Sequence, residues 1–132
     1  MYNKWRDATT RGDIDKVRLL VSEGADVNAK DKFSQTALMY ASRVGNIDLV
    51  RLLVESGANL NITAKYNLSA LMLAVINGHG EVVRILIEAG ADLNIPGGKG
   101  AIGFYGKTAL VLAKERGQEL VISLLQEAGA TE

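Results

Sequence analysis

The chain repeats a short pattern at a fixed interval, and the interval changes once. The pairs Gly24-Ala25, Gly57-Ala58 and Gly90-Ala91 are 33 residues apart, whereas Gly129-Ala130 follows after 39 residues. A period of this length is typical of stacked repeats, in which each unit buries its apolar face against the next. We therefore expect a domain whose function lies on an exposed surface, and we expect that surface to be altered where the interval changes.

Each unit is expected to fold as two short helices. In the second unit the first helix is expected over residues 36–44 and the second over 47–56, where Ile47, Val50 and Leu53 recur at helical spacing. A glycine follows each helix, at a place where a left-handed residue ends a helix at little cost. These glycines are Gly12, Gly45, Gly78 and Gly117 after the first helices, and Gly24, Gly57, Gly90 and Gly129 after the second.

Small and hydroxyl-bearing residues also recur in register within the first helices. The small residue is alanine in every unit, and it lets neighbouring helices approach closely. The hydroxyl residue stands where the first helix begins, so its side chain should cap that helix. The alanines are Ala8, Ala41, Ala74 and Ala113, and the caps are Thr36, Ser69 and Thr108.

The segment Gly24-Ala25-Asp26-Val27-Asn28, which returns with small changes at 57–61 and 90–94, resembles the ankyrin repeat. That family's proline is replaced by Ala37, Ala70 and Ala109, and its histidine by Met39, Met72 and Val111, so apolar packing is expected in place of a histidine hydrogen-bond network. The resemblance implies an all-α solenoid of paired antiparallel helices with β-turn or hairpin fingers. A finger is here the loop that joins the second helix of one unit to the first helix of the next. Protein–protein interaction is the general role that it implies.

We expect one domain over residues 1–132, with repeats at about 1–30, 31–63, 64–96 and 97–132. Asp7 and Gln126 replace apolar residues of the inner repeats, as terminal repeats with polar outer faces require, so the array is expected to be complete. We also expect a cytoplasmic monomer without membrane contact, because no apolar run approaches membrane-spanning length.

The composition argues against catalysis and against bound cofactors. The chain has no cysteine and one histidine, His79, at a position where it should cap or pack. No second histidine or positioned serine completes a catalytic set, so we expect no enzyme activity, no metal site and no cofactor. Formal net charge is zero, and we expect no nucleic-acid binding.

The longer interval reflects a glycine-rich insertion in the last finger, at 95–107. Asn61 to Ser69 is eight residues, but Asn94 to Thr108 is fourteen, which leaves six extra. The segment matches a dinucleotide fingerprint at Gly98-x-Gly100-x-x-Gly103 and a relaxed phosphate loop at Ala101-x4-Gly106-Lys107-Thr108. No strand precedes it, as such loops require, and Thr108 already serves as a helix cap. These two observations argue against a phosphate-binding loop. Small-molecule or nucleotide binding through this finger is kept as the alternative hypothesis, behind the one that follows.

The favoured hypothesis is a surface that binds an acidic protein or peptide. Basic residues outnumber acidic ones in the fingers and first helices, whereas acidic residues prevail in the second helices. Phe33, Tyr66 and Tyr105 share one repeat position in the fingers, and exposed aromatics often anchor partners. The predicted contacts are the anchors Phe33, Tyr66, Phe104 and Tyr105, the steering cations Lys32, Arg43, Lys65 and Lys107, and the groove-lining Gln35, Leu68, Ile76 and Asn77.

Overall fold

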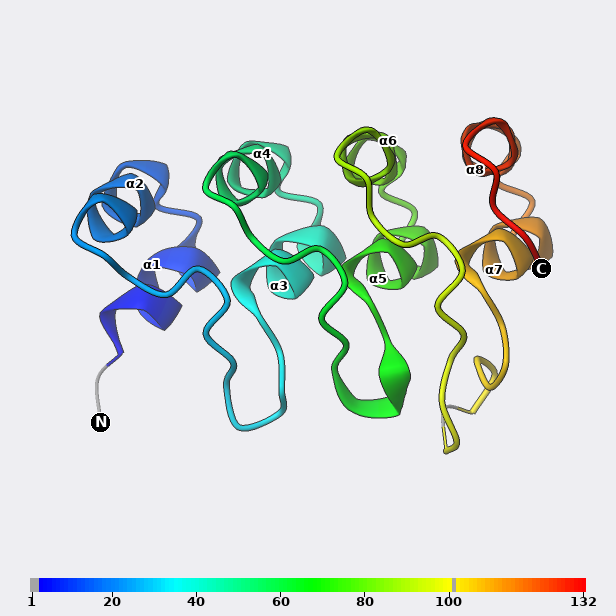
Figure 1. The fold of residues 1–132 in the computed structure, drawn as a ribbon, viewed down its shortest axis with the longest axis horizontal. Coiled ribbons are helices and arrows are strands. Elements are labelled where there is room, and N and C mark those ends of the chain that lie inside the picture. Colours follow the sequence, from blue (N-terminus) through cyan, green and yellow to red (C-terminus); the bar gives the residue numbers. More distant parts are fainter. Residues whose placement is uncertain (1–2, 101) are drawn as a thin grey trace.

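The computed structural model describes residues 3–100 and 102–132, in which eight α-helices stack as four antiparallel pairs (Figure 1). The first helices of the pairs form one layer and the second helices another, and the fingers extend from the same side of the stack. The first helices are α1 (Lys4–Arg11), α3 (Ala37–Val44), α5 (Ala70–Ile76) and α7 (Ala109–Glu115). The second helices are α2 (Ile14–Ser22), α4 (Ile47–Glu55), α6 (Gly80–Glu88) and α8 (Glu119–Glu127). The all-α solenoid predicted from the repeat is thus confirmed.

The fingers contain little regular structure in the part of the chain described. A 3-10 turn, η1 (Lys65–Asn67), forms the tip of the middle finger. Isolated bridges join Thr63 to Ser69 in that finger and Gly97 to Tyr105 in the last one. The fingers are therefore compact turns, held by short-range backbone hydrogen bonds and by contacts with their neighbours.

A continuous apolar core lies between the two helical layers. Leu49 and Leu53 of α4 and Leu86 of α6 have no exposed surface. The recurring alanines of the first helices are at most 2% exposed, as expected where neighbouring helices approach closely. Met39 and Met72 are also buried, so apolar packing does occupy the place of the family's histidines.

The helix ends follow the sequence prediction closely. The hydroxyl oxygens of Thr36 and Ser69 accept hydrogen bonds from the backbone N–H groups of Met39 and Met72, at 3.3 and 3.2 Å. The glycines that follow the helices all have φ between +65° and +92°. In this left-handed region a Cβ atom costs about 1–2 kcal/mol, so glycine fits best.

Asparagine side chains tie each repeat to the next. The Oδ1 atom of Asn28 accepts a hydrogen bond from the backbone N–H of Asn59 at 2.7 Å. Asn61 accepts one from Asp92 at 2.7 Å, and Asn94 accepts one from Thr131 at 2.8 Å. The third bond has the same form as the first two, although the insertion lies between its partners. The insertion therefore leaves the stacking of the fourth repeat unchanged.

Other side chains also connect the pairs. The Nε2 atom of His79 lies 2.9 Å from the carbonyl oxygen of Arg43, and no side-chain cap forms at the start of α6. His79 thus contacts the preceding repeat, so of the two expected roles, capping and packing, the structure shows no side-chain cap. Gln118, at the same repeat position, donates from Nε2 to the carbonyl oxygen of Val75 at 2.8 Å.

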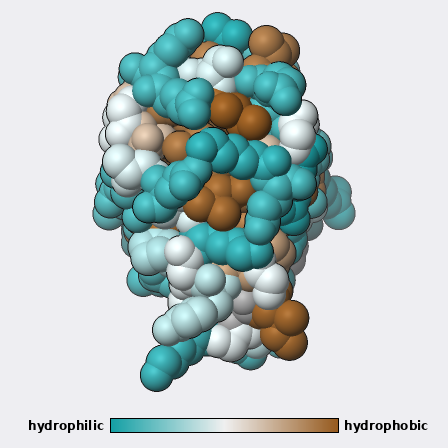
Figure 2. All heavy atoms as spheres, turned by 90° about the vertical axis from the view of Figure 1, so that its right-hand side faces the viewer, coloured by the Kyte–Doolittle hydropathy of each residue, from teal (hydrophilic) through white to brown (hydrophobic). Residues whose placement is uncertain are grey.

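The C-terminal end of the stack is mainly hydrophilic, with hydrophobic patches near its middle and at its upper and lower right edges (Figure 2). Gln126 is exposed there, as expected for the outer face of a terminal helix. Leu120, also in α8, is 82% exposed. At the other end, Asp7 bonds to Arg11 within α1, at 3.1 Å. The polar substitutions at both ends thus lie at the surface of the described chain.

Candidate functional site

Three aromatic side chains lie exposed on three successive fingers. Phe33, Tyr66 and Tyr105 are 56%, 40% and 62% exposed. They occupy the same position in their repeats, and the three fingers extend from the same side of the stack (Figure 1). Their placement agrees with the sequence prediction of a row, while their role in binding stays a prediction.

A lysine lies over the aromatic ring on two of these fingers. The ammonium nitrogen of Lys32 is 5.1 Å from the centre of the Phe33 ring, and that of Lys65 is 4.9 Å from the centre of the Tyr66 ring. Cation–π contacts at exposed sites contribute roughly 0.5–1 kcal/mol. Each of these two fingers therefore presents an aromatic ring and a positive charge side by side.

The remaining predicted contacts differ in how accessible they are. Leu68 and Ile76 are half-buried and pack against the core, so little of either side chain faces solvent. Asn77 is exposed, and its Nδ2 atom donates to the carbonyl oxygen of Leu73 at 2.8 Å. Lys107 is paired with Glu115 at 2.7 Å, so its charge is shared within the chain. Phe104 is half-buried beside Arg116, whose guanidinium is 5.9 Å from the ring centre.

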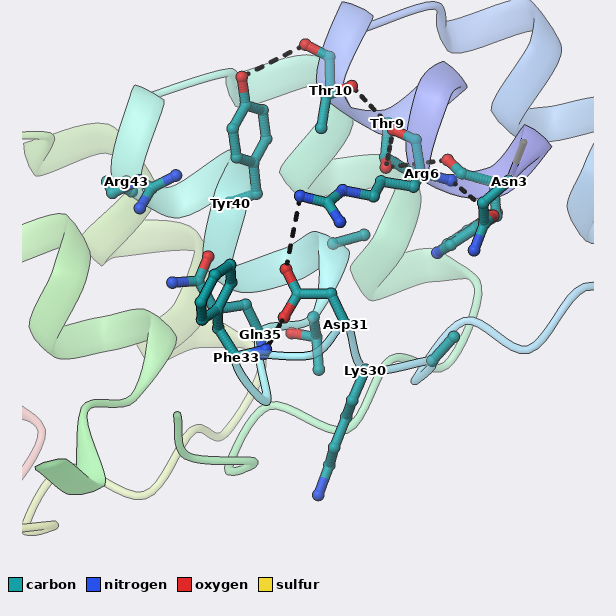
Figure 3. Close-up of a pocket in the computed structure, with 14 residues that line it drawn as sticks. Asn3, Arg6, Thr9, Thr10, Lys30, Asp31, Phe33, Gln35, Tyr40 and Arg43 are labelled. Atoms are coloured by element: carbon teal, nitrogen blue, oxygen red, sulfur yellow. Dashed lines mark hydrogen bonds and ion pairs between the residues drawn. The ribbon is translucent and has the colours of Figure 1, made fainter. Parts of the chain in front are cut away.

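A cavity of about 300 Å³ lies between the first two repeats (Figure 3). Its walls come from α1, from α3 and from the finger that precedes α3. Three of the predicted contacts, Phe33, Gln35 and Arg43, line it together. The other lining residues are Asn3, Trp5, Arg6, Thr9, Thr10, Ala29, Lys30, Asp31, Thr36, Ala37 and Tyr40. The predicted contacts beyond the first finger and α3, from Lys65 onward, do not line it.

Hydrogen bonds fix the shape of this cavity. The hydroxyl of Tyr40 donates to the carbonyl oxygen of Thr10 at 3.3 Å, which ties α3 to the end of α1. The Oδ1 atom of Asp31 accepts from the backbone N–H groups of Phe33 and Gln35 at 2.8 and 3.0 Å. These last two bonds close the turn of the finger, so Phe33 and Gln35 are held at the edge of the cavity.

Sequence reasoning missed Trp5, Arg6, Asp31 and Tyr40 as parts of a site. One signal was present, because Tyr40 stands at the inner helix position that Leu73 and Leu112 occupy in later repeats. An aromatic at that position marks the second repeat as different. The contribution of Trp5 and Arg6 depends on how α1 stacks on α3, which the repeat pattern alone does not specify.

The insertion packs against the middle finger. The backbone N–H of Gly98 donates to the carbonyl oxygen of Tyr66 at 2.6 Å, and Nδ2 of Asn67 donates to the carbonyl oxygen of Pro96 at 2.9 Å. A Cβ atom on Gly100 would lie 3.1 Å from the Tyr66 ring. Glycines in this finger therefore allow close approach to Tyr66.

Tyr66 has a left-handed backbone conformation, with φ of 65°. A bulky residue rarely adopts this conformation, which costs of order 1–3 kcal/mol unless the surroundings impose it. Here Asn67 is left-handed as well, and both residues are held by the contacts with the insertion. The finger contacts thus fix the direction of an exposed aromatic side chain.

The relaxed phosphate-loop match coincides with side chains that are already engaged. The Lys107 ammonium pairs with Glu115, and the Thr108 hydroxyl donates to the carbonyl oxygen of Thr131 at 2.9 Å. Ala101, the first residue of the relaxed phosphate-loop match, lies outside the described residues. The helix that follows, α7, has 7 residues. Glycine in this finger is accounted for by packing and turns.

Within residues 3–100 and 102–132, histidine, aspartate and glutamate side chains do not gather into a group that could hold a metal ion. None of the described helices has the length and apolarity needed to cross a bilayer.

A sequence model of a protein family, described as ankyrin repeats, matches residues 6–97 in three copies. The match ends inside the glycine-rich finger, and the fourth helix pair lies beyond it. A search of curated proteins finds no match to the chain.

Proposed function

Because the chain belongs to the ankyrin repeat family, whose members are generally protein–protein interaction modules, we propose that it is a non-enzymatic module that binds an acidic protein segment along its fingers and first helices. The observation that carries the proposal is the exposed row formed by Phe33, Tyr66 and Tyr105. Aromatic side chains supply large contact areas at interfaces, and truncating such anchors commonly removes most of the affinity.

Charge supports an acidic partner. Lys32 and Lys65 lie beside the first two aromatics, and neither is paired with an acidic side chain among the described residues. Lys99 adds a further cation to the last finger. The basic residues of the second helices differ from these lysines, because Arg51 and Arg84 both form ion pairs with Glu81. A complementary acidic segment would be attracted to the finger side, and its association rate would fall as salt rises.

The test uses a blocked peptide of about twelve residues that alternates glutamate and tyrosine and spans ~40 Å when extended. We expect the full chain to bind this peptide in fluorescence anisotropy, and a variant with Tyr66→Asn and Tyr105→Ala to bind it at least tenfold more weakly. Asparagine tolerates the left-handed conformation at position 66, so the variant should keep its fold. Leu120→Ala is the control, because Leu120 is exposed in α8, away from the fingers.

Equal affinity of the aromatic variant and the wild type would contradict the proposed role of the row. Unchanged affinity between low and moderate salt would contradict the acidic partner. A circular dichroism melt of each variant shows whether lost binding reflects lost fold. Non-enzymatic action and a cytoplasmic monomer remain part of the proposal.

A further inference from the structure

We infer that the cavity between the first two repeats is an anchoring subsite for one carboxylate side chain, aspartate or glutamate, of the acidic partner. The inference rests on the proposed function and adds where a single acidic residue is held. It starts from Arg6 and Arg43, which come from helices α1 and α3 of two different repeats and line one cavity. In Figure 3 the Tyr40 side chain lies between them, and Lys30 points away from the group.

Both guanidinium groups keep donors available. The Nη2 atom of Arg6 lies 3.9 Å from Oδ2 of Asp31, at the outer limit for an ion pair, and the Arg6 side chain is 53% exposed. Arg43 rests over the Tyr40 ring, 5.4 Å from its centre, and forms no ion pair with the described carboxylates of residues 3–100 and 102–132. A guanidinium carries five N–H donors in a planar fork that matches a carboxylate. Neither arginine is saturated by the chain's own acidic groups.

The cavity is also shaped for the side chain that carries the charge. Trp5, Phe33 and Tyr40 supply aromatic walls, and Gln35 adds an amide at the edge. Aromatic walls shield a charge-assisted hydrogen bond from water and so strengthen it. A volume of about 300 Å³ is at the small end for a binding pocket and suits one side chain of a longer segment better than a whole ligand.

Asp31 decides between a carboxylate and a phosphate. Its Oδ1 atom is committed to the finger turn, and its Oδ2 atom faces Arg6. A fixed negative charge in the cavity repels a phosphate, with its charge of about −1.5 to −2, more strongly than a singly charged carboxylate. Because the Lys30 side chain points away, two arginines against one aspartate leave room for one further negative charge.

The experiment compares charge variants against the glutamate–tyrosine peptide of the previous section. We expect Arg6→Gln with Arg43→Gln to weaken binding at least tenfold. Lys16→Gln with Arg18→Gln removes the same charge from exposed positions of α2 and should change the affinity less than threefold. In an NMR titration, the side-chain Nε–Hε signals of Arg6 and Arg43 should shift with the peptide and stay in place with a glutamine–tyrosine peptide.

The outcomes separate the subsite from the general proposal. The carboxylate subsite is overturned if the Arg6 and Arg43 variant binds with wild-type affinity while the Tyr66 and Tyr105 variant loses binding. The proposed binding surface would then still stand. Tighter binding of a phosphoserine–tyrosine peptide overturns the choice of carboxylate. Absence of binding to any of these peptides by the wild type contradicts the proposed function itself. Melting curves confirm that the arginine variants are folded.

Discussion

Some glycines in this protein are required only by a left-handed backbone, whereas Gly45 is also required because the His79 ring lies against it. Gly45 and Gly57 both have left-handed backbones, with φ of 78° and 84°. A Cβ atom on Gly57 would meet open space, whereas one on Gly45 would lie 2.5 Å from Nδ1 of His79. The His79 ring is held there by its bond to the carbonyl oxygen of Arg43. Gly45 is therefore required both by the turn and by the next repeat.

We predict that Gly45→Ala destabilises the fold more than Gly57→Ala does. Left-handed strain alone should lower the free energy of unfolding by about 1–2 kcal/mol at either site. Gly45→Ala should lose about 1 kcal/mol more, because the His79 ring must move and give up its hydrogen bond. Urea unfolding followed by circular dichroism measures both values, and equal losses would contradict a role for the His79 contact.

Residue type predicted some of these local features but not all of them. Glycine after each helix and a hydroxyl residue before the first helices are sufficient to predict helix ends, because capping is a local interaction. The left-handed backbone of Tyr66 could not be predicted, since tyrosine rarely adopts it. It depends on contacts with Pro96 and Gly98, about thirty residues further along the chain.

At the scale of elements, the last finger forms a folded unit that holds its own shape. The N–H of Gly97 donates to the carbonyl oxygen of Lys107 at 3.0 Å. The N–H of Gly106 in turn donates to the carbonyl oxygen of Gly97 at 2.8 Å. Gly97 is buried, and a Cβ atom there would lie 2.0 Å from the carbonyl oxygen of Phe104. The backbone of this finger is thus packed too closely for any side chain at position 97.

We expect Gly97→Ala to open the last finger while the helices stay folded. Hydrogen exchange at the amide of Gly106 should become at least tenfold faster, because its bond to Gly97 is lost, while the amide of Leu53 in α4 keeps its protection.

Gly80→Ala serves as the control for this experiment. Gly80 lies in α6, where a Cβ atom would make only an ordinary contact, at 3.8 Å from Val121. Because Gly80 is the first residue of α6, alanine there should change the stability of the helix by less than the ~0.5–1 kcal/mol that applies in a helix interior. Unchanged exchange at Gly106 in Gly97→Ala would show that the finger adapts without losing these bonds.

The elements were easier to predict than the cavity they form. Helix positions follow from apolar residues that recur within each repeat, and the aromatic row follows from one repeat position. The cavity depends on Trp5 and Arg6 of the shortened first repeat, which stand at the helix positions that Leu38 and Met39 occupy in the second. Its geometry comes from packing between repeats, which a comparison of repeats with one another does not reveal.

At the scale of the whole molecule, the described helices pack mainly against those of adjacent repeats. The helices pack in the order α1, α3, α5, α7 in one layer and α2, α4, α6, α8 in the other. In such a stack an inner repeat is stabilised by two interfaces and a terminal repeat by one. Loss of core packing should therefore have different consequences in the middle and at the end.

We predict that Leu86→Ala and Leu125→Ala unfold the protein in different ways. Both side chains are fully buried, and truncating either one should cost about 2–5 kcal/mol locally. Leu86 lies in α6, between two neighbours, so Leu86→Ala should lower the midpoint of a single urea transition. Leu125→Ala should release the fourth repeat first, with fast exchange in α8 and a protected α4. Identical exchange patterns in the two variants would contradict nearest-neighbour stacking.

The bond between Asn94 and Thr131 has a consequence for how this chain can vary. It closes over 37 residues in the sequence, whereas the equivalent bonds close over 31, yet all three are between 2.7 and 2.8 Å long. Six extra residues in the last finger therefore leave this bond between the third and fourth repeats unchanged. The part of the last finger between Asn94 and Thr108 is a natural place to graft a foreign peptide, or for evolution to try new recognition sequences, while the helices beneath stay in register.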